Sequence, residues 1–213
     1  MSFRVVCISA VDGARGEEVA PEVAKELGYR LVDEEIIRNA AQEAGVDASQ
    51  VAEVEKRRSL AIRLLDSLGT STSLSTFAMA GYVPPVDTPA DSDLRGLIRT
   101  AIEELAQRGE AVIVAHAASM ALGDRADVLK VMLTASDGAR QSTLAEQRGL
   151  DEKAARKEVE RGDTNRADYL KRFYGISHES PADYDLVLNT DRLGADGAVS
   201  LIVQAAGAPQ PVA

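Results

Sequence analysis

A short apolar run near the start of the chain leads directly into a turn that contains glycine. Residues 5–9 (VVCIS) are expected to form a buried β-strand, and Gly13 and Gly16 follow before a helical pattern begins. A strand that ends in a glycine turn at the start of a helix is typical of a phosphate-binding loop, because backbone N–H groups and the helix dipole attract anions there. Such loops usually continue into Gly-Lys-Ser or Gly-Lys-Thr, whereas Glu17 and Glu18 follow here. The pattern therefore predicts a phosphate site in which carboxylates stand where a lysine is expected.

Short apolar runs alternate with amphipathic helical patterns along the chain. In such a pattern each helix crosses over from one strand to the next, which builds a parallel sheet. The strands are expected at residues 4–9, 30–32, 111–114, 128–133 and 184–189. The sequence therefore predicts an α/β fold with a mostly parallel sheet of about five strands and helices on both faces. The turns after the first and third strands are expected at the same edge, where sheets of this kind bind ligands.

The length of 213 residues fits one α/β domain, which we expect to span residues 1–206 with a flexible tail at 207–213. Residues 69–93 are rich in Gly, Ser, Thr and Pro, and they follow a helix expected to end near Leu68. A segment of this length without periodicity usually acts as a lid or is disordered, so we expect a mobile excursion. Residues 165–174 concentrate Arg, Lys and Tyr and form the most cationic part of the chain.

The composition argues against several classes of partner and site. A formal net charge of −10 and only 4% aromatic residues argue against binding of nucleic acid, and the same charge argues against an anionic membrane surface. Cys7 is the only cysteine, so no intramolecular disulfide can form, and the start of the chain lacks the apolar run of a signal peptide. We therefore expect a cytoplasmic protein. One cysteine and two scattered histidines also lack the spacing of metal ligands, so no metal site is expected from them.

Four segments of the chain match a known sequence pattern. They are residues 8–18, which hold the glycine turn, residues 26–37, residues 108–114 and residues 163–190. Through these segments the chain resembles, over nearly its whole length, the cytidylate kinase-like family of bacterial P-loop proteins, which are relatives of nucleoside monophosphate kinases. The resemblance implies a three-layer P-loop kinase-like fold. It also implies an acceptor nucleotide site under the excursion at 69–93 and an arginine-bearing helical lid around residues 150–175.

The same resemblance implies an activity, which is in-line phosphoryl transfer from ATP to a nucleoside monophosphate such as cytidylate, with Mg²⁺ as the metal ion. It places the ATP phosphates at loop residues Gly13, Ala14, Arg15, Gly16, Glu17 and Glu18. It places the acceptor nucleotide at Asp33, Arg38 and His116. The catalytic residues that it implies are Arg166, Arg161 and Asp163. On this interpretation the lid arginines are solvated, so replacing Arg166 by alanine weakens nucleotide binding or transfer and leaves the melting temperature almost unchanged.

Two departures from the family pattern bear on activity. Family members usually read Gly-Ser-Gly-Gly-Arg-Glu in the first loop, whereas this chain has Glu17 where the phosphate-binding arginine is expected. They usually place Gly-Arg-Gly after the third strand, whereas this chain has Ala115, His116 and Ala117. Arg15 and His116 are the nearby side chains that can replace the lost charges in part. Two interpretations stay open: an ATP-dependent kinase with impaired transfer, or a catalytically inactive nucleotide-binding or regulatory protein on the kinase fold.

Each candidate residue also has a simpler structural interpretation. The glycine turn can be an ordinary connection between a strand and a helix, and Asp33 can serve only as the N-cap of the helix that follows it. His116 can be a neutral side chain bonded to a backbone carbonyl. Arg161 and Arg166 can belong to a solvated helix face. The functional and the structural interpretations differ in whether these side chains meet a nucleotide.

Overall fold

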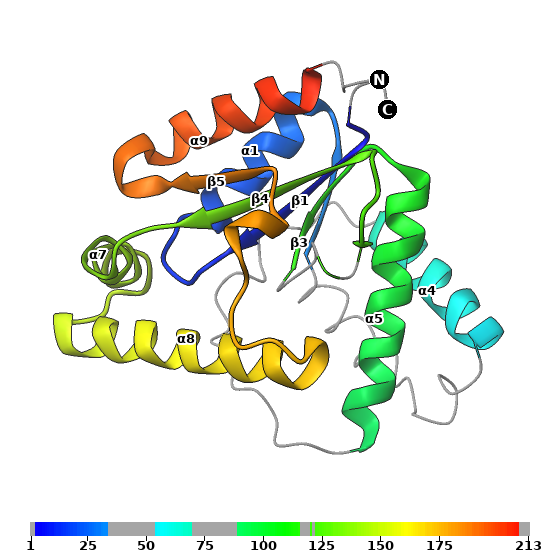
Figure 1. Cartoon of the computed structure of the whole chain (residues 1–213), viewed down its shortest axis with the longest axis horizontal. Coiled ribbons are helices and arrows are strands. Elements are labelled where there is room, and N and C mark those ends of the chain that lie inside the picture. The colour runs from blue at the N-terminus through cyan, green and yellow to red at the C-terminus, as the bar shows by residue number, and fades with distance from the viewer. Residues whose placement is uncertain (1–2, 34–53, 70–88, 116–119, 121, 209–213) are drawn as a thin grey trace. The chain divides into compact units, whose positions relative to one another are not determined.

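The computed structural model of the chain describes residues 3–33, 54–69, 89–115, 120 and 122–208. The chain falls into two compact units: unit 1 comprises Met1–Asp33 with Gly109–Ala213, and unit 2 comprises Glu34–Arg108. Unit 1 holds the sheet and the helices that follow its strands, whereas the described residues of unit 2 form two helices (Figure 1).

Unit 1 is built on a five-stranded sheet in which every pair of neighbouring strands is parallel. The strands are β1 Val5–Ala10, β2 Arg30–Asp33, β3 Ala111–Val114, β4 Val128–Thr134 and β5 Leu186–Asn189, and their order is β2-β3-β1-β4-β5. Central β1 pairs with β3 in a register that runs from Val5 opposite Ala111 to Ile8 opposite Val114. Because β1 and β3 run in the same direction and side by side, both end at the same edge of the sheet. The parallel sheet and this shared edge, both expected from the sequence, are confirmed.

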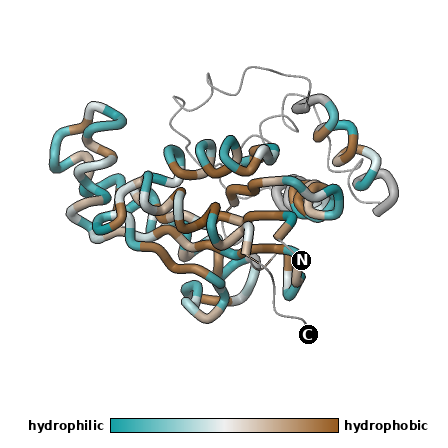
Figure 2. The backbone as a smooth tube through the Cα atoms, turned by 90° about the horizontal axis from the view of Figure 1, so that it is seen from above, coloured by the Kyte–Doolittle hydropathy of each residue, from teal (hydrophilic) through white to brown (hydrophobic). Residues whose placement is uncertain are grey.

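The described helices of unit 1 are α1 Gly16–Leu27, α7 Asp137–Arg148, α8 Glu152–Tyr174 and α9 Thr190–Gly207, with a short 3-10 turn at Pro181–Asp183. α1 and α9 pack together on one face of the sheet, and the apolar residues concentrate along the strands beneath them (Figures 1 and 2). Val6 and Ile8 of β1 face this core together with Val19 of α1 and Ile202 of α9. Cys7 is also fully buried, and burial raises the pKa of its thiol to about 12, so the thiol stays neutral.

Local capping explains where these helices begin and end. α1 ends at Gly28, which has φ 66° and donates its N–H back to the last turn. α7 begins after Ser136, whose side chain accepts from the N–H of Ala139, and α8 begins after Asp151, whose side chain accepts from the N–H of Ala154. α8 continues for 23 residues to Gly175, so the cationic stretch of the sequence belongs to one long helix.

Two helix boundaries differ from the pattern read in the sequence. The periodic pattern of the last helix begins at Ala195, but α9 begins at Thr190, because Asn189 caps a first turn and Gly194, at φ 66°, then interrupts the helix without ending it. In unit 2, α5 Pro89–Arg108 includes residues 89–93, which were expected in the excursion and are helical. The remainder of the excursion, residues 70–88, lies outside the described residues.

Unit 2 contains α4 Val54–Gly69 and α5, which pack against each other. Two ion pairs join them: Arg58 of α4 with Glu104 of α5 at 2.6 Å, and Asp66 of α4 with Arg108 of α5 at 2.9 Å. Across both units, none of the helices that the structure describes has the length and apolar character needed to cross a membrane.

Candidate functional site

The turn between β1 and α1 forms a tight loop at the carboxyl end of the central strand. Gly13 has φ 79° and Arg15 has φ 58°, both in the left-handed region, and α1 begins at Gly16. A Cβ atom on Gly16 would lie 2.6 Å from the Cβ of Ala10, so the start of the helix packs closely against the end of the strand. Within the described part of the chain, the N–H groups of Arg15, Gly16 and Glu17 donate no hydrogen bond, and no side chain caps the helix. These N–H groups are therefore available to an anion.

The charged side chains of this loop are arranged unfavourably for a phosphate. Glu17 is exposed in the first turn of α1, so its carboxylate repels any other anion bound there. Arg15 forms an ion pair with Glu18, with 2.9 Å between Nη1 and Oε2, and Gln147 of α7 also donates to Glu18. Arg15, the cation that the sequence offers in place of the missing one, is thus held by a neighbouring carboxylate.

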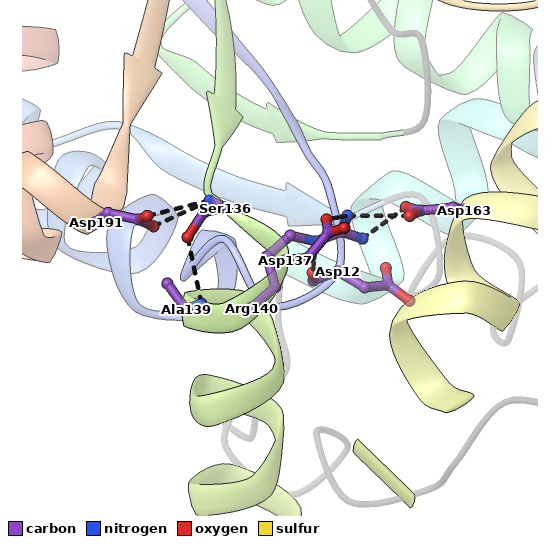
Figure 3. A network of polar contacts seen from close by, with 7 residues as sticks. All are labelled: Asp12, Ser136, Asp137, Ala139, Arg140, Asp163 and Asp191. Carbon is purple, nitrogen blue, oxygen red and sulfur yellow. Dashed lines mark hydrogen bonds and ion pairs between the residues drawn. The ribbon is translucent and has the colours of Figure 1, made fainter. Parts of the chain in front are cut away.

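Arg140 in α7 joins the loop to α8 (Figure 3). Its Nε donates to the backbone oxygen of Asp12 at 2.7 Å. Its two Nη atoms donate to both carboxylate oxygens of Asp163 at 3.0 and 2.6 Å. The side chain is only 6% exposed. Gly13 lies against the backbone of the same residue, because a Cβ on Gly13 would be 2.5 Å from the backbone oxygen of Arg140. Loop, α7 and α8 therefore meet at one arginine.

Arg166 in α8 forms a second link to the end of β1, and it is buried. Its Nη1 donates to the backbone oxygen of Ala10 at 3.0 Å, and its Nη2 donates to Oγ of Ser9 at 2.5 Å. It also pairs with Glu179, whose Oε2 accepts from Nε at 2.9 Å. Side-chain exposure is 10% for Arg166 and 1% for Glu179. The expectation that Arg166 is solvated is therefore wrong, because the segment after α8 brings a buried carboxylate onto it.

The carboxylate of Glu179 has hydrogen-bond donors on both oxygens. Oε1 accepts from the hydroxyl of Ser9 at 3.3 Å and from the hydroxyl of Tyr184, and Oε2 accepts from Arg166. A buried carboxylate is tolerated when it is paired and hydrogen bonded in this way. The cluster of Ser9, Arg166, Glu179 and Tyr184 thus forms a satisfied polar network beneath the loop.

Sequence reasoning missed Arg140 and the partners of Arg166, although two signals were present. Ser9 is a hydroxyl residue in an otherwise apolar strand, and a buried polar group needs a partner. Arg140 lies at helical spacing from buried Thr143 and Leu144, so a charged residue sits on the buried face of α7. Glu179 gives no comparable signal, because it lies in a short polar segment between α8 and β5.

The proposed acceptor residues are only partly described. Asp33 ends β2 and lies opposite Val114 of β3, so it stands at the same edge of the sheet as the loop. Arg38 and His116 lie outside the described residues.

The three residues implied as catalytic all lie in α8, and they differ in their contacts. Asp163 is bound by Arg140, and Arg166 is bound to the end of β1, so both meet the loop region. Arg161 instead forms an ion pair within its own helix, with Glu158 at 2.5 Å.

The side chain of Asp12 fits the magnesium ion that the family resemblance implies. Mg²⁺ prefers oxygen ligands and usually binds through one or two carboxylates together with phosphates of a substrate. Asp12 lies in the loop beside Gly162 of α8, where a Cβ would be 2.2 Å from its Oδ2. Among the described residues no cation pairs with this carboxylate. Its donor chemistry therefore suits a magnesium ion that arrives with a nucleotide.

Comparisons with known proteins find similarity to kinases. A sequence model of the cytidylate kinase-like family matches residues 5–192. A cytidylate kinase from the archaeon Ignicoccus hospitalis is 29% identical over 199 residues, which cover 93% of this chain and 96% of that protein. The sequence resembles a family of bacterial proteins, whereas this relative comes from an archaeon.

Solved structures show the same fold at low identity. A protein from Eubacterium ventriosum, described only as uncharacterized, superposes with a TM-score of 0.66 at 16% identity, and the match covers 94% of this chain and 96% of that one. A sugar kinase from Janibacter superposes with a TM-score of 0.50 at 13% identity, covering 97% and 99%. These likenesses show the α/β kinase-like fold, whereas the sequence match extends over most of the chain. The chain belongs to the cytidylate kinase-like family.

Proposed function

We propose that the chain is an ATP-dependent phosphotransferase that acts on a nucleoside monophosphate, with cytidylate as the first candidate acceptor. The observation that carries this proposal is the group of open N–H donors at Arg15, Gly16 and Glu17, where the central strand ends. In an open parallel sheet a ligand binds at this edge, and α1 adds the positive end of its dipole. Membership of the family and similarity to a cytidylate kinase support the same assignment.

The proposed reaction asks mainly for alignment and neutralisation of charge. An oxygen of the acceptor phosphate attacks the γ-phosphorus in line while the bond to the ADP oxygen breaks. The loop binds the ATP phosphates through its N–H groups, and Asp12 would hold Mg²⁺, which would supply positive charge to the phosphate oxygens. Asp33, at the end of β2, is the described residue of the proposed acceptor site. Closure of the lid around residues 150–175 excludes water.

A second function, nucleotide binding without transfer, is favoured by the pairing of the cations beside the loop. Three arginines contact carboxylates there: Arg15 with Glu18, Arg140 with Asp163, and Arg166 with Glu179. Phosphoryl transfer needs positive charge on the transferred group. The carboxylate beside each arginine offsets part of its positive charge, which favours slow transfer or none.

Calorimetric titration with ATP and magnesium, followed by a transfer assay with CMP, UMP, AMP and GMP, separates the two functions. A kinase binds ATP and converts at least one monophosphate to the diphosphate. A regulatory protein binds ATP and converts none of them. Absence of binding heat, together with an unchanged melting temperature at millimolar ATP, would contradict both.

Glu17→Arg is expected to tighten ATP binding about 10- to 100-fold. A unit charge pair at 4 Å is worth about 1 kcal/mol in water and about 4 kcal/mol at an effective dielectric near 20, and the exposed position of Glu17 argues for the lower part of this range. The substitution replaces a repulsion by an attraction, and each 1.4 kcal/mol corresponds to about tenfold in affinity. The measurement is a titration with ATP and magnesium at fixed ionic strength.

Glu26→Arg is the matched control for this substitution, because Glu26 is exposed near the other end of α1 and the change in net charge is the same. Affinity close to the wild-type value is expected there. If wild-type protein binds ATP tightly and Glu17→Arg brings no gain, the loop works in its present form and the predicted penalty is wrong.

A further inference from the structure

The loop that carries the open N–H groups is held in place from one side by Arg140. The guanidinium donates to the backbone oxygen of Asp12 at 2.7 Å, immediately before Gly13. Gly13 lies so close to the backbone of Arg140 that a Cβ would be 2.5 Å from its oxygen and 2.8 Å from its Cα. Side chain and backbone of one residue therefore fix two successive residues of the loop.

The same guanidinium reaches α8 on its other side. Both Nη atoms donate to Asp163 in a two-point pair at 3.0 and 2.6 Å, and Asp137 adds a longer ion pair at 3.5 Å (Figure 3). Two-point pairing of arginine with a carboxylate fixes direction as well as distance. Asp163 stands three residues before Arg166 in the same helix, so a constraint on Asp163 is also a constraint on the turn that bears Arg166.

The bonding of Arg140 indicates a supporting role rather than contact with a nucleotide. Its Nε is used by the loop and its two Nη atoms are used by α8, while the side chain is 6% exposed. We infer that Arg140 is a positioning residue that sets the conformation of residues 12–15 and ties it to α8, so that the N–H groups of the loop converge on a phosphate. This inference rests on the proposed nucleotide function for its biological meaning. The effect on the loop itself can be measured without any nucleotide.

The test compares the free wild-type protein with three variants by amide hydrogen exchange of Ala14, Glu18 and Val19, whose N–H groups donate to the backbone oxygens of Val11 and Arg15 in the loop. Arg140→Gln removes the guanidinium group. Arg140→Lys keeps the positive charge but lacks the planar guanidinium that bonds Asp12 and Asp163 at the same time. Leu144→Ala is the control, because Leu144 is buried in the same helix and its truncation destabilises the protein without removing a hydrogen bond to the loop. Exchange of these three amides is expected to accelerate at least tenfold in Arg140→Gln and in Arg140→Lys, and to match wild type in Leu144→Ala.

The second readout is the affinity for ATP with magnesium, measured on the same proteins. Both Arg140 variants are expected to raise the dissociation constant at least tenfold, whereas Leu144→Ala lowers the melting temperature and leaves the constant within about twofold. If Arg140→Gln does not fold, Asp163→Ala takes its place in the test. This variant keeps the bond from Arg140 to Asp12 and removes the pair between Arg140 and α8, so a smaller rise in loop exchange is expected.

The outcomes separate this inference from the proposed function. Unchanged exchange of Ala14, Glu18 and Val19 in the Arg140 variants, or equal acceleration in Leu144→Ala, overturns the positioning role. Accelerated exchange in the Arg140 variants alone supports it, even if wild-type protein shows no affinity for ATP, a result that would overturn the proposed function by itself. Unchanged ATP affinity despite faster loop exchange overturns the link between the loop conformation and phosphate binding.

Discussion

Arg166→Ala is expected to lower the free energy of unfolding by about 3–5 kcal/mol, because it leaves a buried carboxylate without its counter-ion. The side chain of Glu179 is 1% exposed, so its carboxylate depends on protein donors rather than on bulk water. The substitution also removes the donors to the backbone oxygen of Ala10 and to Ser9. Urea denaturation followed by circular dichroism measures the loss. Glu179→Ala is expected to be similarly destabilising, since it leaves the guanidinium of Arg166 buried without its carboxylate.

Arg161→Ala is the control for this prediction. Arg161 is in the same helix and also forms an ion pair, but its side chain is about half exposed. An exposed pair contributes at most about 1 kcal/mol, so the expected loss is small. A loss below about 1 kcal/mol for Arg166→Ala as well would show that the buried pair is not maintained in solution. The interpretation of Arg166 as a solvated lid arginine would then be correct.

Gly13→Ala is expected to destabilise the protein by about 2–5 kcal/mol and to abolish nucleotide binding. The residue has φ 79°, a region that costs other residues about 1–2 kcal/mol. A Cβ there would also lie 2.5 Å from the backbone oxygen of Arg140, which cannot move aside as the end of a flexible side chain can, and overpacking of this kind costs about 1–3 kcal/mol more. Thermal and urea unfolding measure the stability, and titration with ATP measures the binding.

Gly149→Ala separates the two contributions. Gly149 follows α7 with φ 64°, but a Cβ on it would meet no atom within 4 Å. Only the conformational cost of about 1–2 kcal/mol is therefore expected, with nucleotide binding retained. If Gly13→Ala is no worse than Gly149→Ala in stability and in binding, the close approach of the loop to α7 does not constrain the site.

The sheet could be predicted from the sequence because buried parallel strands are continuous apolar runs. Residues 5–8 and 111–113 are entirely buried, and neither run has the spacing of an amphipathic helix. The start of α5 was missed although its signals were present: Pro89 stands at the first helical position with Asp91 in the first turn, where both residue types are favoured. The Pro and Thr content before it made the segment look like part of a loop.

The candidate site could be predicted only in its local part. The glycine turn is a contiguous pattern, so its position after β1 and before α1 followed from the sequence. The burial of Arg166 did not follow, because its environment is made by Ser9, 157 residues earlier, and by Glu179, 13 residues later. A pattern of charges along a helix shows which residues share a face, but it does not show which distant carboxylate covers that face.

The separation along the chain between the loop and its supports determines when the site can form during synthesis. The backbone oxygens of Asp12 and Ala10 accept from side chains 128 and 156 residues further on. The loop therefore leaves the ribosome well before the arginines that hold it, which lie at least 128 residues further along the chain. Contacts of such long range form late in folding, since much of the chain must be ordered before they close. If nucleotide binding needs the loop held in this way, it is expected only after α7 and α8 have been synthesised.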